Sequence, residues 1–226
     1  MTDMNTDTDR LIDQLSARAL PVRRMSSPLF RTLAWLALAL LVVAIIVSNF
    51  DVGAGWTRVM ASPDATVEWS LSLLTGVLAS YAVFQVSVPG RSPRWAWLPV
   101  PAAVLWIAGL GLGCMHEFAR EGSAALTFHE GPMECFRAIT MTSIPLGLVL
   151  LLMVRHAGVV RPGSTALLVM LSAATLSSSA VSLIHHGGES SLMVLLWHVG
   201  AVLLLSLLSL LFSRRMFAWI GYSRRV

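Results

Sequence analysis

Six long runs of apolar residues, separated by short polar breaks, dominate the sequence. The runs cover residues 32–50, 66–88, 95–113, 136–154, 164–184 and 190–212. A helix needs ~20 apolar residues to cross the hydrocarbon core of a bilayer, and each run is close to that length. A helix also satisfies its own backbone hydrogen bonds, as a lipid environment requires. The pattern therefore predicts an all-α polytopic membrane protein, with six transmembrane helices in residues 32–212 and a loop at residues 51–63.

Composition and charge agree with this prediction and also predict which side of the membrane each end of the spans faces. Only 12% of the residues are charged, compared with about 25% in a typical soluble domain. All sixteen basic residues are arginine, and six spans place thirteen of them on the side of the two termini. The positive-inside rule makes that side cytoplasmic, so both termini are expected in the cytoplasm. Since topology explains the arginines, no direct contact with nucleic acid is expected.

Two cytoplasmic segments are predicted outside the bilayer, residues 1–31 and an Arg-rich tail at residues 213–226. In the first, residues 9–20 have the pattern of a short amphipathic helix, with Asp9 as its N-cap and Leu11, Ile12 and Leu15 on its apolar stripe. Such a short helix is marginally stable alone in water, so the stripe is expected to cover a surface. That surface is either the membrane and the chain's own helices, or a partner protein.

The middles of the six spans hold no Asp, Glu or Arg, which argues against an ion-coupled transporter. Small and hydroxylated residues in the third and fifth spans indicate close helix packing and hydrogen bonds across helices. These residues are Gly109, Gly111, Gly113, Ser172, Thr175, Ser178, Ser179 and Ser182. His198 in the sixth span is expected to be hydrogen-bonded to a neighbour, and a haem or metal ligand is the alternative. His185 and His186 are expected at the outer ends of the spans.

Residues 114–135 form the predicted outer loop between the third and fourth spans, and the only two cysteines bracket it. Cys114 and Cys135 have three interpretations, which the sequence leaves open. A structural disulfide would close a loop of about 20 residues and stabilise the fold by roughly 3 kcal/mol. A regulatory thiol pair is the second. The third is a metal site with His116 and His129, because thiolates and imidazoles bind soft or borderline metals. The spacing matches neither CxxC nor HExxH.

No motif of an enzyme is present in the chain. The sequence resembles no hydrolase triad, P-loop or dinucleotide-binding fingerprint. A protein without catalytic activity is therefore predicted. No resident cofactor is expected either, apart from transient binding of a heavy metal at the cysteines.

Several short motifs resemble the NrsF-type proteins, a family with six spans that was first described as a domain of unknown function. The resemblance extends over essentially the whole chain, and its most specific parts are the two cysteines and the run around His198. The motifs are Asp9-Arg10-Leu11-Ile12, Pro21-Val22-Arg23-Arg24, Ser87-Val88-Pro89-Gly90-Arg91, Gly113-Cys114, Glu134-Cys135-Phe136 and Val194-Leu195-Leu196-Trp197-His198-Val199-Gly200-Ala201.

The resemblance implies a membrane-bound anti-sigma factor of the bacterial inner membrane. Such a protein sequesters an extracytoplasmic-function sigma factor until a stress is sensed outside, and Cys114 and Cys135 would be the sensing pair. The segment with Leu11, Ile12 and Leu15, followed by Arg23 and Arg24, is the candidate for partner binding. The third span is the expected route of the signal. The alternative function is a small redox or transport protein that binds metal or haem.

Overall fold

The computed structural model describes residues 3–17, 26–50, 52–122, 132–157, 159–184 and 191–219, and these residues form helices without any strand. Within this part of the chain, six helical segments are long and apolar enough to cross a membrane. They are Pro28–Val47, Pro63–Val86, Pro93–Glu121, Met133–Val154, Pro162–Ile184 and Ser191–Trp219. The predicted all-α fold is confirmed, and so is the number of helices that are long and apolar enough to span a membrane.

Proline defines the start of most of these helices. Pro28, Pro63, Pro132 and Pro162 are each the first residue of a helix, where the missing N–H costs nothing. Ser27 and Ser62 cap two of them by accepting a backbone hydrogen bond. The elements are α1 (Asp3–Ala17), α2 (Pro28–Val47), α3 (Val52–Ala61), α4 (Pro63–Val86), η1 (Pro93–Trp97), α5 (Val100–Glu121), α6 (Pro132–Val154), η3 (Arg155–Ala157), α7 (Pro162–Ile184), α8 (Ser191–Val194), the π-helical turn η4 (Leu195–Val199) and α9 (Gly200–Trp219).

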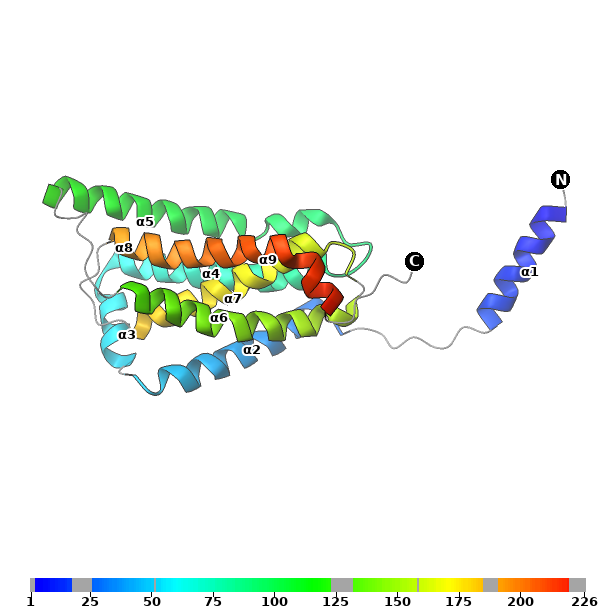
Figure 1. Cartoon of the computed structure of the whole chain (residues 1–226), viewed down its shortest axis with the longest axis horizontal. Helices are drawn as coiled ribbons and strands as arrows, with labels where there is room; N and C mark the ends of the chain where they lie inside the picture. Colours follow the sequence, from blue (N-terminus) through cyan, green and yellow to red (C-terminus); the bar gives the residue numbers. More distant parts are fainter. Residues whose placement is uncertain are drawn as a thin grey trace.

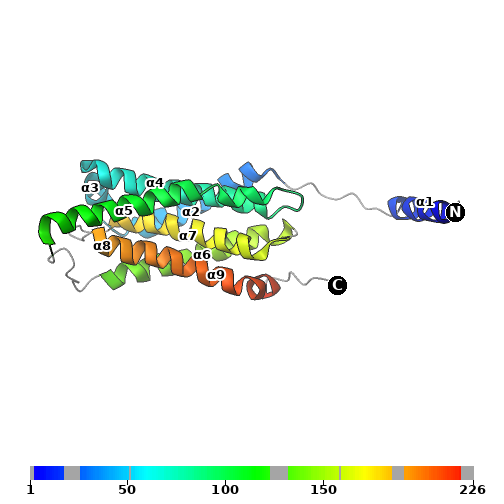
Figure 2. The ribbon, with the colours of Figure 1, turned by 90° about the horizontal axis from the view of Figure 1, so that it is seen from above.

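Helix α7 is the centre of the bundle and is buried along most of its length. It packs against α4, α6 and α9, while α2 lies on α4 and α5 lies against α4 and α8 (Figures 1 and 2). The last span, formed by α8, η4 and α9, contacts both α5 and α6. Helix α1 stands apart from the bundle in Figure 1.

Hydroxyl groups join α7 to its neighbours in the interior of the bundle. Ser172 Oγ donates to the Gly76 carbonyl oxygen at 2.7 Å, and Ser72 Oγ donates to the Thr175 carbonyl oxygen at 3.2 Å. Gly76 permits this close approach, because a Cβ there would lie 2.7 Å from a carbon of the Leu176 side chain. Ser172, Ser178 and Ser179 of the fifth span therefore bond across helices, as predicted. Thr175 and Ser182 instead donate to carbonyl oxygens within α7.

The two ends of the bundle differ in charge. At one end, which we call the arginine end, Arg31 Nη2 donates to the Met153 carbonyl oxygen at 2.6 Å, and Arg161 Nη1 donates to the Arg91 carbonyl oxygen at 3.2 Å. The opposite end, which we call the acidic end, holds the first turns of α4, α6 and α8 and the last turns of α5. Six spans of alternating direction gather the charges at these ends, as the sequence pattern predicts.

The clearest differences from the prediction concern α1, the loop at residues 51–63, the outer loop and the end of α9. Helix α1 begins at Asp3, so Asp9 lies inside it and is not its N-cap; acidic residues early in the helix favour this longer form. The predicted loop at residues 51–63 contains α3, which Gly55 fits against the end of α7. A Cβ on Gly55 would lie 1.7 Å from the Leu183 carbonyl oxygen. Contact with α7 therefore overrides the weak helix propensity of glycine.

The other two differences are longer helices. Helix α5 continues to Glu121 and α6 begins at Pro132, so both cysteines lie in helices and the outer loop is shorter than residues 114–135. Helix α9 continues to Trp219, beyond the predicted end at residue 212. In both cases charged residues such as Glu117 and Arg215 break the apolar pattern, but they favour helix, so the apolar pattern alone could not include these turns. Helix α5 ends at Gly122, whose φ of +61° suits glycine.

Candidate functional site

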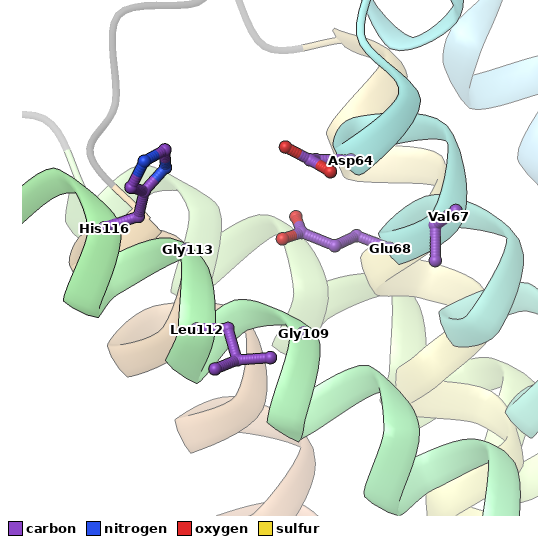
Figure 3. Close-up of a pocket in the computed structure, with 7 residues that line it drawn as sticks. All are labelled: Asp64, Val67, Glu68, Gly109, Leu112, Gly113 and His116. Carbon is purple, nitrogen blue, oxygen red and sulfur yellow. The ribbon is translucent and has the colours of Figure 1, made fainter.

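A cleft of about 420 Å³ opens at the acidic end between α4 and α5. Helix α4 contributes Asp64 and Glu68, and α5 contributes His116 on the opposite wall. In Figure 3 the two carboxylates point into the gap from one side and the imidazole faces it from the other. The cleft can thus present two carboxylates and an imidazole to a solute at this end.

Two glycines of α5 face Glu68 at ordinary contact distance. A Cβ on Gly109 would lie 3.9 Å from Glu68 Cγ, and a Cβ on Gly113 would lie 3.7 Å from Glu68 Oε1. Gly113 also approaches α8, since its Cβ would lie 3.0 Å from Ser191 Oγ, whereas Gly111 faces open space. Close helix packing, predicted for all three glycines, is therefore found at Gly113 and is wrong for Gly111.

The two cysteines lie on different helices at the acidic end, and both are thiols in this structure. Cys114 is half-buried on α5. Cys135, in the first turn of α6, is only 1% exposed and packs with Val181 of α7 and Ala201 of α9. The described parts of α5 and α6 make at most marginal contact, because the last span packs against both. The last span therefore contacts the helices that carry both thiols.

The metal site predicted from the sequence is only partly described. His129, His185 and His186 lie outside the described residues. Within the described ranges, no three His, Cys, Asp or Glu side chains lie close enough to share a metal ion. His116 is exposed and lines the cleft with Asp64 and Glu68. A metal site at the cysteines stays a prediction.

Glu117 fastens the end of α5 to the start of the last span. Its Oε2 accepts a hydrogen bond from the backbone N–H of Ser191 at 2.8 Å, and its Oε1 accepts one from Ser191 Oγ at 2.8 Å. A carboxylate at a helix N-terminus is favourable, because it pairs with backbone N–H groups that lack partners within the helix. Glu117 follows Cys114 by three residues, so the two lie on neighbouring positions of one helix face.

The π-helical turn η4 lies just beyond this contact and is also tied to the surrounding helices. His198 is 2% exposed, and its Nδ1 lies 2.9 Å from Ser178 Oγ of α7. The predicted hydrogen bond of His198 to a neighbour is thus confirmed. Trp197 meets the ring of Phe136, which follows Cys135, with 6.1 Å between the ring centroids. Such π-helical turns are frequent at functional sites.

Neither the cleft nor the Glu117–Ser191 contact could be predicted from the sequence. Both depend on the alignment of residues that are distant in the chain, and Glu117 and Ser191 are 74 positions apart. The only local signal was the helix-favouring sequence that carries α5 beyond Cys114. The partner-binding candidates Leu11, Ile12 and Leu15 are more than half exposed on α1. Arg23 and Arg24 lie outside the described residues.

Replacing Glu117 with alanine is expected to destabilise the acidic end. The variant loses two hydrogen bonds to a charged acceptor, and one such bond is worth about 1.5–3 kcal/mol. We expect a lower midpoint of thermal unfolding for the detergent-solubilised protein. Glu121→Ala is the matched control, since Glu121 is exposed one turn later on the same helix. Equal midpoints for the two variants would show that the Glu117–Ser191 contact adds no stability.

The fold and the site define a multi-pass helical membrane protein whose acids and thiols gather at one end of the bundle. The chain belongs to the NrsF family, described as negative regulator of sigma F, which matches residues 15–219. The resemblance predicted from the motifs is confirmed. No curated protein and no solved structure matches the chain. Membership places the protein among negative regulators of a sigma factor rather than among enzymes, and its implied partner is a sigma factor.

Proposed function

We propose that this protein is an anti-sigma factor of the bacterial inner membrane that sequesters an extracytoplasmic-function sigma factor. It releases this partner when Cys114 and Cys135 react with an oxidant or a thiol-binding metal in the periplasm. The observation that carries the proposal is the family match over residues 15–219. The match begins at Leu15, the last residue of the exposed apolar stripe on α1 that is the candidate contact for the sigma factor.

The last span is the best candidate for carrying the signal, in place of the third span expected from the sequence. It is held next to Cys114 through the Glu117–Ser191 hydrogen bonds. It also contacts the helix of Cys135, through Trp197 on Phe136 and through Ala201. A change in the spacing of the two thiols would therefore act on a helix that continues to the arginine end at Trp219. This is a two-state element biased from one end.

Co-purification tests the sigma-factor partner directly. The full chain is co-expressed with one candidate extracytoplasmic-function sigma factor at a time and solubilised in detergent. It should retain one of these sigma factors and release it after treatment with an oxidant or a thiol-binding metal. If a sigma factor is retained but neither treatment releases it, the proposed partner is supported and the proposed redox or metal signal is refuted. Retention of none from the complete set of the host would overturn the partner itself.

Topology is tested by reporter fusions at the turns. Fusions at Arg91 and Arg161 are expected to report the cytoplasm, because these arginines lie at the arginine end. Fusions at Glu121 and Gly188 are expected to report the periplasm. Alkaline phosphatase and green fluorescent protein, which are active on opposite sides, serve as reciprocal controls for each position. A clear reversal at one turn would contradict the orientation.

A further inference from the structure

An apolar groove of about 260 Å³ runs along the bundle between α6 and α9, in the half nearer the arginine end. Its walls are formed by Ile144 and Leu148 of α6 and by Leu208 and Phe212 of α9, with Met170 of α7 beneath them. The four wall residues are each more than a third exposed, so the groove opens sideways to the surroundings. In a membrane, this opening faces the lipid.

The length of the groove corresponds to one leaflet. Its lining on α9 extends from Leu205 to Met216, which is about 16 Å at 1.5 Å per residue. One leaflet contributes about half of the ~30 Å hydrocarbon core. The one polar lining residue, Ser209, is already hydrogen-bonded, since its Oγ donates to the Ala166 carbonyl oxygen at 2.9 Å. The walls therefore suit a hydrocarbon chain and offer nothing to a polar solute.

An arginine stands at the same end of each wall. Arg155 directly follows α6 and is eleven positions, or about three helical turns, after Ile144, so the helical repeat brings it to the end of the α6 wall. On α9, Arg215 places its Cζ 6.0 Å from the ring centroid of Phe212, a wall residue. Both arginines are exposed. Helices α6 and α9 run in the same direction (Figure 1), so Arg155, directly after α6, and Arg215, near the end of α9, lie at the same end of the bundle.

We propose that this groove binds one anionic phospholipid, with an acyl chain between α6 and α9 and its phosphate between Arg155 and Arg215. The two arginines favour a lipid with a negatively charged headgroup, because an apolar groove alone would accept any lipid. Guanidinium groups bind phosphate through paired N–H donors, and basic pockets between transmembrane helices recognise anionic headgroups. This inference concerns a lipid and stands independently of the sigma-factor partner.

Native mass spectrometry of the full chain in detergent tests the site with two defined probes. Phosphatidylglycerol and phosphatidylcholine of identical acyl chains are titrated separately, and the state with one bound lipid is measured. Wild type should bind phosphatidylglycerol more tightly. Arg155→Gln with Arg215→Gln should weaken its binding about thirtyfold, from ~1 kcal/mol per arginine at 1.4 kcal/mol per factor of ten. Arg91→Gln with Arg94→Gln, two exposed arginines at the same end, is the matched control and should bind like wild type.

A second pair of variants tests the hydrocarbon part of the groove. Leu208→Trp fills it and should weaken the binding of both lipids, whereas Leu204→Trp, equally open on α9 but outside the groove, should not. Arg215→Gln alone, with an expected loss of about fivefold, decides the matter if the double variant fails to fold. Equal affinity of wild type for the two lipids, or equal losses in the arginine variant and its control, would overturn the proposal. So would a wild-type dimer that Leu208→Trp disrupts, because a second copy would then occupy the groove.

Discussion

Replacing both Cys114 and Cys135 with serine is expected to abolish induction of the sigma-dependent genes by oxidants and thiol-binding metals, while repression remains. Serine keeps the size of each side chain but forms neither a disulfide nor a strong metal–thiolate bond. Cys135 is buried against α7 and α9, so its chemistry bears directly on packing around the last span. The measurement is transcription from a sigma-dependent promoter before and after each treatment.

The size of this effect depends on which chemistry the thiols perform. Moving a population from 1:99 to 99:1 takes about 5.5 kcal/mol of differential free energy. A disulfide contributes about 2–4 kcal/mol and would give a graded response unless the resting state is closer to balance. A thiolate-bound metal supplies more, since structural zinc sites reach about 10 kcal/mol. A steep, switch-like response would therefore favour metal binding.

The matched control for the cysteines replaces two exposed sulfur residues beside them. Met115 follows Cys114 directly and is 70% exposed, and Met133 precedes Cys135 by two positions and is 69% exposed. Met115→Ser with Met133→Ser should respond like wild type. If the double cysteine variant also responds like wild type, the cysteines are structural and sensing lies elsewhere at the acidic end, with the cleft around Glu68 as the next candidate.

Introducing aspartate at Leu11 and Leu15 is expected to release the sigma factor and switch on its genes constitutively. Both leucines are more than half exposed in the structure, and burial of a leucine against a partner is worth roughly 1.5–3 kcal/mol. Losing both contacts would weaken binding at least a hundredfold. The measurement combines promoter activity without stress with the amount of the protein in the membrane.

A control with the same added charge isolates the apolar stripe. Arg10→Gln with Ala17→Asp changes the net charge of α1 by the same −2 as the two aspartates at Leu11 and Leu15. Neither position is three or four residues from the stripe, so both lie away from it. This variant should still repress. Unchanged repression by the Leu11 and Leu15 variant, at a normal protein level, would move the binding surface to the loops or tail at the arginine end.

The apolar runs were sufficient to predict the six spans, because membrane insertion depends mainly on local composition. They could not predict α3, which forms because Gly55 lets one helix approach the Leu183 carbonyl closely. Nor could they predict where α5 and α9 end, since polar residues such as Glu117 and Arg215 interrupt the apolar pattern without interrupting the helix. The boundaries of the loops were wrong for that reason.

The candidate site was predictable only in its cysteines. Their number and positions in the sequence identified Cys114 and Cys135, but not that the last span packs against the helices of both. The cleft is lined by Gly109 and Gly113 of α5 opposite Glu68 of α4, and the alignment of two spans along each other cannot be read from either sequence segment alone. Periodicity predicts which residues share one face of a helix. Which other helix packs against that face depends on how the whole bundle is arranged.

The hydroxyl contacts between α4 and α7 also constrain how the protein is made. Helix α4 is the least apolar of the six spans. Its partner helix, α7, is synthesised much later, because Gly76 and Ser172, which share a hydrogen bond, are 96 positions apart. At about 5–20 residues per second, roughly 5–20 s pass before α7 is synthesised. Until then α4 is a poorly apolar helix alone at the membrane, and this interval is when a membrane-protein chaperone or quality-control protease would have access to it.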